Sequence, residues 1–159
     1  MAVTPLSWPE TVQHPTPMQR FLTGLPFLGP DKCAYRHFRR EVAAREPEDC
    51  RSLWTKYMPI ISVRDKVLEV LEDTMRWRSR NFIPADPIDI LLFHPGWWFG
   101  GEDSFFAQLH LMKLFRRCPV LKIMNHCKDG TLGDLVEALA GNKEEHGEMG
   151  VPREKSGGS

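Results

Sequence analysis

Apolar residues recur at steps of three and four along most of the chain, which is typical of amphipathic helices. The run from Ser62 to about Arg80 is the clearest. Ser62 and Asp65 are spaced as in a capping box, and arginines near the end of the run suit the negative end of a helix dipole. A second run, Ser104 to Arg117, is apolar over so wide an arc that we expect burial on more than one side. The predicted inward positions of the first run are Val63, Val67, Val70, Leu71 and Thr74 or Met75. In the second run Phe105, Leu109 and Met112 fall on one face, and Phe106, Leu111, Leu114 and Phe115 widen it.

Three shorter helical segments flank these runs. One covers Asp31 to about Arg45, and another covers Cys50 to about Tyr57. The third begins at Thr131, which forms a second capping-box pattern with Asp134, and ends at a stop signal in Gly141. Together with the two longer runs, they predict a mainly α protein built as a small helical bundle.

The run Ile88–Phe93 allows two interpretations, because a short apolar stretch fits either a buried strand or an apolar segment inside a bundle. In the second case the chain stays mainly α. In the first case the fold class changes to α/β, with a short parallel β-α-β unit over residues 88–126.

Six prolines divide residues 1–30, so we expect an extended arm there rather than a helix or a central strand. This arm is too apolar for a solvated linker, since it contains Trp8 and Phe21 among other large side chains. We expect it to pack on its own domain or on a partner. The predicted organisation is an arm at 1–30, short helices at 31–59, a helical core domain at 60–142 and a disordered tail at 143–159.

Charge and composition narrow the possible functions. Lys and Arg together number 21, as do Asp and Glu, so the sequence does not favour nucleic-acid binding by bulk electrostatics. We find no apolar run long enough for a transmembrane helix and no secretory signal, and we expect an intracellular protein of the cytoplasm or mitochondrion. The four cysteines match no metal-ligand spacing, so we expect free thiols and no metal site. No pattern indicates catalytic residues.

The segment Gly101–Phe105, with the sequence GEDSF, is the strongest candidate for a functional site. It places Ser104 at the start of an amphipathic helix, directly after Asp103 and close to two glycines. Free backbone N–H groups and the positive end of the helix dipole favour an anionic group such as a phosphodiester at this position.

With this motif the chain resembles the acyl and peptidyl carrier proteins, whose signature is a glycine, any residue, then Asp-Ser and an apolar residue at the head of the second helix. The resemblance covers about residues 62–141. It implies a small helical bundle, 4′-phosphopantetheine on Ser104 with Asp103 as its acidic neighbour, and an acyl group carried as a thioester. The loop before Ser104 is longer than in that family, and the helix after it is more basic.

Other interpretations of the same residues stay open. The simplest is that Asp103 or Ser104 only caps a helix. A strand, a glycine loop, a helix and a second strand over 90–126 would instead resemble a fragment of a two-Rossmann-domain glycosyltransferase. The chain could also be a non-catalytic accessory subunit of a larger, possibly mitochondrial, assembly. In that case Trp97, Trp98, Trp8 and Phe21 would contact protein partners.

Overall fold

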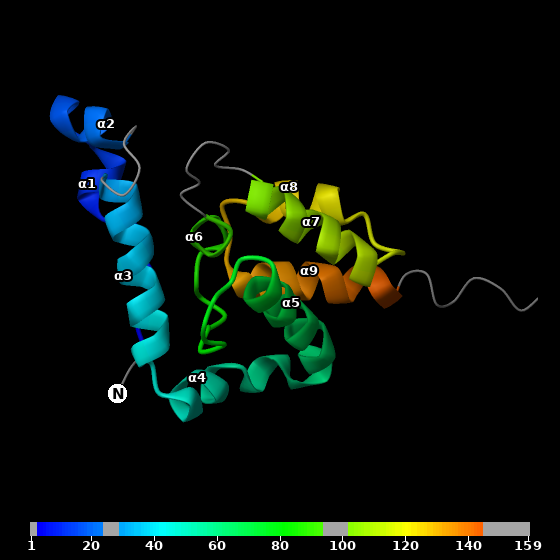
Figure 1. Ribbon diagram of the computed structural model, residues 1–159. Helices are drawn as coiled ribbons and strands as arrows, with labels where there is room; N and C mark the ends of the chain where they lie inside the picture. The colour runs from blue at the N-terminus through cyan, green and yellow to red at the C-terminus, as the bar shows by residue number, and fades with distance from the viewer. Residues whose placement is uncertain (1–2, 24–28, 94–101, 145–159) are drawn as a thin grey trace, which may run out of the picture.

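The structure, a computed structural model, describes residues 3–23, 29–93 and 102–144, and over these residues it is mainly helical (Figure 1). The prediction of a small helical bundle is therefore confirmed. Within the described residues, β-type pairing is limited to an isolated antiparallel bridge between Pro87 and Thr131. The elements are α1 (Glu10–Gln13), α2 (Pro17–Thr23), α3 (Pro30–Ala44), α4 (Pro47–Leu53), the 3₁₀ helix η1 (Thr55–Ile60), α5 (Ile61–Asp73), α6 (Ile88–Leu91), α7 (Glu102–Leu114), α8 (Val120–Cys127) and α9 (Leu132–Glu144).

The alternative fold, with a parallel β-α-β unit over 88–126, is wrong because both of its expected strands are helical. Its first strand corresponds to α6 and its second to α8. At the end of α6, the N–H of Leu92 donates to the carbonyl of Ile88 at 2.9 Å, so this donor is not available to a neighbouring strand. Hydrophobicity alone did not distinguish the two cases, since a buried strand and a short buried helix are equally apolar.

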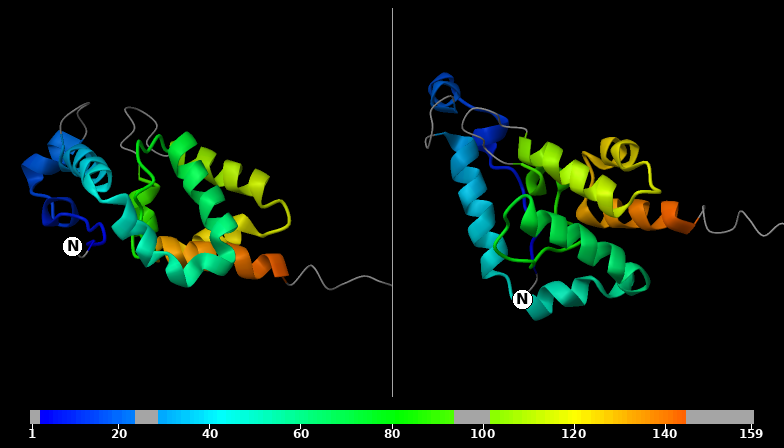
Figure 2. Two further views of the ribbon diagram at one scale, coloured as in Figure 1. Left: turned by 90° about the horizontal axis from the view of Figure 1, so that it is seen from below. Right: turned by 45° about the vertical axis from the view of Figure 1, so that its right-hand side comes forward.

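The helices form two groups, and the segment 74–93 lies between them in both views of Figure 2. On one side stands α3, against which α1 and α2 pack. On the other side, α7 and α9 each pack against both α5 and α8. At one end of the molecule, α4 and η1 connect α3 to α5 (Figure 1). The predicted site at the start of α7 therefore belongs to the group formed by α5, α7, α8 and α9.

One hydrophobic core joins the predicted segments 1–30, 31–59 and 60–142. Leu6 enters it from the N-terminal segment, Phe38 from α3 and Trp54 from the end of α4. All three side chains are buried, as are the inward residues of α5 and α9. Burial of apolar surface is the main stabilising contribution to a fold of this size. The N-terminal arm and the short helices thus share the core of the bundle.

The N-terminal arm contains two short helices, α1 and α2, although its prolines predicted none. Pro9 is the N-cap residue of α1, and Pro17 is the first residue of α2. At these positions the missing N–H of proline costs little, because the first N–H groups of a helix have no partner within it. The arm packs on its own domain: Leu6 is buried, and the indole nitrogen of Trp8 donates to Asp89 Oδ2 at 2.6 Å.

α5 begins and ends at different residues from those predicted. The 3₁₀ helix η1 leads directly into α5, so Ser62 lies inside the helix and the predicted capping box with Asp65 does not form. The helix ends at Asp73 rather than near Arg80. The chain turns at Arg76, whose φ of 55° lies in the left-handed region, and the next residue, Trp77, is buried in the core.

The predicted capping box at the start of α9 is confirmed. The carboxylate of Asp134 accepts hydrogen bonds from the backbone N–H and the hydroxyl of Thr131, both at 2.8 Å. In return, the N–H of Asp134 donates to Thr131 Oγ1 at 3.3 Å. These bonds from Thr131 lower the pKa of the Asp134 carboxyl below its ordinary value of 3.8. The helix continues past the predicted stop at Gly141 to Glu144.

Loss of this cap gives a testable effect on stability. We expect Thr131→Ala to lower the free energy of unfolding by about 1 kcal/mol at neutral pH. The pKa of the Asp134 carboxyl is lower in the folded state than its ordinary value. The carboxylate therefore adds its full share to the free energy of unfolding above the ordinary pKa, and this share is lost as the pH falls through the folded-state pKa. The difference between variant and wild type should therefore shrink below about pH 3.8. Urea unfolding at neutral and acidic pH measures this difference in the free energy of unfolding. Thr131→Ser, which keeps the hydroxyl, should stay close to wild type, and a pH-independent difference would contradict the assignment.

A buried ion pair connects the N-terminal segment to the bundle. The carboxylate of Asp86 is 0% exposed and accepts hydrogen bonds from both terminal nitrogens of Arg45, at 2.7 and 2.8 Å. It also accepts the backbone N–H groups of Leu6, at 3.2 Å, and of Ile83, at 2.8 Å. The backbone carbonyl of Asp86 accepts the N–H of Leu132, at the start of α9, at 2.8 Å. Asp86 therefore links the arm, the end of α3 and the start of α9.

Candidate functional site

Ser104 lies in the first turn of α7, where the sequence predicted a helix start. Its side chain is half-buried. Backbone N–H groups in the first turn have no acceptor within the helix, and the helix dipole gives this end a partial positive charge. Both features favour an anionic group on a hydroxyl at this position, against the repulsion from the adjacent Glu102 and Asp103. The helix starts two residues earlier than predicted, at Glu102, so Ser104 lies within the first turn rather than at its boundary.

Contacts with α5 and α8 fix the position of α7. Ala107, Leu111 and Phe115 form the buried face of this segment. At the end of α5, Thr74 Oγ1 lies 3.1 Å from His110 Nδ1, so a polar contact supplements the apolar ones in the middle of α7. Because the helix is held along its length, the serine in its first turn has a defined position relative to the bundle.

The outer side of α7 is apolar and exposed, although the sequence predicted burial on more than one side of this helix. Phe105 and Phe106 are 55% and 52% exposed, and Leu109 and Met112 are 42% and 39% exposed. The prediction placed both sides of this segment in the core. Leu111 and Phe115 are buried as predicted, but Phe105, Phe106, Leu109 and Met112 are not, because only one of the two apolar sides meets the bundle. We call Phe105, Phe106, Leu109 and Met112 the α7 outer face; exposed apolar side chains grouped in this way often mark an interaction site.

Of the other predicted site residues, the side chains of Trp8 and Phe21 lie in the described part of the chain. Trp97 and Trp98 lie outside the described residues, as does the side chain of Asp103. Trp8, predicted to bind a partner, contacts α3 and the end of α6 edge-on, through Phe38 and Phe93 at centroid distances of 5.3 and 5.0 Å. Phe21 on α2 is 72% exposed, as a partner contact requires. Residues 145–159, which make up most of the predicted disordered tail, also lie outside the described ranges.

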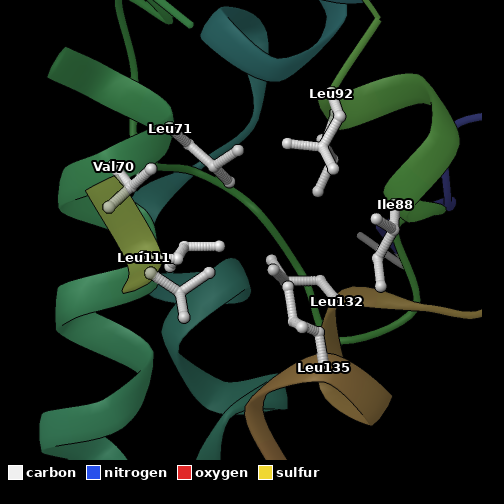
Figure 3. A pocket seen from close by; sticks show the side chains of 9 residues that line it. Val70, Leu71, Ile88, Leu92, Leu111, Leu132 and Leu135 are labelled. Carbon is white, nitrogen blue, oxygen red and sulfur yellow. The ribbon is translucent and has the colours of Figure 1, made fainter. Parts of the chain in front are cut away.

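A small apolar void lies inside the bundle, among side chains from α5, α6, α7 and α9 (Figure 3). Its volume is about 10 Å³, which is about the space that one water molecule needs, and an apolar lining offers water no hydrogen bonds. The void is therefore a packing gap and not a ready ligand pocket. Its lining residues are Val67, Val70, Leu71, Ile88, Leu91, Leu92, Leu111, Leu132 and Leu135.

A larger cleft of about 300 Å³, which the sequence did not predict, lies between α4, α5 and the segment 80–82. It combines an apolar floor with three arginines, Arg51, Arg64 and Arg80. None of its lining residues comes from α7, so it is separate from Ser104. Sequence patterns could not reveal it, because the arginines come from three different segments and form no motif.

The cysteines behave as predicted, since all four lie in described segments as free thiols. Burial raises the pKa of the Cys50 and Cys127 thiols, which keeps them protonated at neutral pH and makes them poor nucleophiles. Over the described residues, no group of three or more His, Cys, Asp or Glu side chains is arranged to hold a metal ion.

The described helices include none with the length and apolar character needed to span a bilayer. Comparison of the chain with protein-family models, with curated proteins and with solved structures gave no match. The resemblance to carrier proteins therefore stays a prediction that rests on this chain's own residues.

Proposed function

We propose that this chain is a carrier-like module that holds an acyl group through 4′-phosphopantetheine on Ser104. The observation that carries the proposal is the position of this serine, half-buried in the first turn of a helix with an apolar outer face. A carrier needs a hydroxyl that a modifying enzyme can reach, on a helix that does not move relative to its domain. The packing of α7 against α5 and α8 is consistent with that requirement.

The chemistry of attachment suits a helix start. The Ser104 Oγ–phosphorus bond forms as the phosphorus–oxygen bond to 3′,5′-ADP in coenzyme A breaks, and the hydroxyl proton passes to a base of the transferase. The product is a phosphodiester anion. Unpaired N–H groups and the helix dipole stabilise a negative charge at this end of α7.

The α7 outer face supplies a docking surface beside the attachment point. Phe105 follows Ser104 directly, and Leu109 and Met112 continue the same side of the helix. Exposed Lys113, Arg116 and Arg117 lie at or just beyond its far end. A partner enzyme with an apolar groove and acidic residues at one end fits this pattern. Since the void in the bundle has a volume of only about 10 Å³, we expect the acyl group to remain outside the core.

Intact-mass measurement tests the proposal. Co-expression with a broad-specificity phosphopantetheinyl transferase should raise the mass of the wild-type chain by one phosphopantetheine group, and fragmentation should locate it on Ser104. Ser104→Ala should abolish the added mass completely. Ser62→Ala, which changes an exposed serine on α5, is the matched control and should be modified like wild type.

Circular dichroism should show equal helix content in both variants, so that loss of modification is not due to unfolding. An unmodified wild-type chain, or added mass that persists in Ser104→Ala, would contradict the proposal.

The accessory-subunit interpretation is the second candidate, and the exposed apolar residues of α2 favour it. Met18 and Phe21 are 73% and 72% exposed on that short helix. Large apolar side chains that are exposed together on one helix can form part of an interaction site. The same mass measurement separates the two candidates, because an accessory subunit needs no group on Ser104. The glycosyltransferase-like interpretation required strands at the start and end of 90–126, where the structure has helices.

A further inference from the structure

The cleft between α4, α5 and residues 80–82 has the shape and chemistry of a small binding site. Its volume of about 300 Å³ is at the lower end of the range found for ligand pockets. Trp54, Leu68 and Phe82 form an apolar floor, and all three are buried. Arg51, Arg64 and Arg80 also belong to the lining, as does Asp65, whose carboxylate is paired with Arg64.

Two of the arginines pair with carboxylates that use only some of their guanidinium N–H donors. Asp65 Oδ1 accepts from Nε and Nη2 of Arg64, at 3.0 and 2.5 Å. Glu72 Oε2 accepts from the same two nitrogens of Arg80. A guanidinium has five N–H donors, so the Nη1 donors of each remain for a further acceptor. Arg51 is exposed at the edge of α4.

The walls of the cleft are fixed by hydrogen bonds that do not involve a ligand. The indole nitrogen of Trp54 donates to the carbonyl of Phe82 at 2.8 Å, and the guanidinium of Arg64 lies 5.5 Å above the Trp54 ring. Asn81 Nδ2 donates to the carbonyl of Arg45 at 2.8 Å, next to the buried ion pair with Asp86. A site that is already rigid loses less conformational entropy when a ligand binds.

We infer that this cleft binds a small organic anion, with a phosphate or carboxylate held by Arg51, Arg64 and Arg80 and an apolar ring or chain in the space beside the apolar floor. Arginine matches the planar, bidentate geometry of these anions better than lysine does. The cleft offers no nucleophile, because burial raises the pKa of the Cys50 thiol in its wall. The inference concerns binding alone and does not depend on the modification of Ser104.

Nuclear magnetic resonance titration with phenyl phosphate tests the inference on the full chain. We expect millimolar phenyl phosphate to shift the indole N–H signal of Trp54 and the side-chain amide signals of Asn81. Inorganic phosphate lacks the apolar half and benzyl alcohol lacks the charge, so each should bind at least several-fold more weakly. Arg51→Ala should weaken phenyl phosphate binding about tenfold, the usual loss for a hydrogen bond to a charged group.

Arg40→Ala is the matched control, because Arg40 is an exposed arginine on α3 away from the cleft lining. It should bind the probe like wild type. The inference is overturned if the Trp54 signal does not move, if inorganic phosphate binds as well as phenyl phosphate, or if Arg40→Ala weakens binding as much as Arg51→Ala.

Discussion

Replacing Asp86 with alanine is expected to lower the free energy of unfolding by about 3–5 kcal/mol. The change leaves the guanidinium of Arg45 buried without a counter-charge, and it removes the acceptor for the N–H groups of Leu6 and Ile83. Domains of this size are stable by about 5–15 kcal/mol, so the variant should be close to unfolding. Urea unfolding followed by circular dichroism measures the loss.

A milder variant keeps the test decisive if Asp86→Ala does not fold. Asp86→Asn retains one oxygen acceptor but no charge, and its loss should lie between those of alanine and wild type. Asp129→Asn, which changes an exposed aspartate before α9, should stay within about 0.5 kcal/mol of wild type. An Asp86→Ala protein within about 1 kcal/mol of wild type would show that the ion pair is not a stabilising centre.

Trp77→Ala is expected to cost about 3–5 kcal/mol, as do other truncations of large buried aromatic residues. Trp77 is buried in the core, packs edge-on against Phe82 at a centroid distance of 5.3 Å, and donates from its indole nitrogen to the carbonyl of Leu91 at 3.0 Å. This bond ties the turn after α5 to the end of α6. Thermal and urea unfolding measure the total loss.

Trp77→Phe separates the hydrogen bond from the packing. It keeps a buried ring but leaves the Leu91 carbonyl without this donor, which should cost about 1–3 kcal/mol. Hydrogen exchange of the amides in 88–92 should speed up in this variant. Trp8→Phe removes the hydrogen bond from the indole nitrogen of Trp8 to Asp89, which is more exposed to solvent. It should lower the free energy of unfolding by less than Trp77→Phe does. If Trp77→Phe matched wild type in both measurements, the Leu91 bond would not be what holds α6.

Periodicity predicted the buried side chains correctly in a helix with one apolar face. It did not do so in a helix with two apolar faces. In α5, Val63, Val67 and Val70 are buried as predicted. In α7 the same reasoning placed two apolar sides in the core, but only the side of Leu111 is buried, because spacing alone cannot say which side meets the bundle. That error concerns the proposed site directly, since the exposed side begins at Phe105, next to Ser104, whereas Ala107 and Leu111, three and seven positions after Ser104, are buried.

Local sequence patterns were enough to predict the longer helices, the cap at Thr131 and a serine at the start of α7. These features depend on neighbours within a few positions, where propensity, capping and periodicity operate. The choice between a mainly α and an α/β fold required the three-dimensional structure, in which residues 88–91 are helical, and so did the packing of Trp8 on its own domain and the cleft lined by three distant arginines. These outcomes depend on contacts between residues far apart in the chain, and local patterns carry no information about which distant partner a side chain meets.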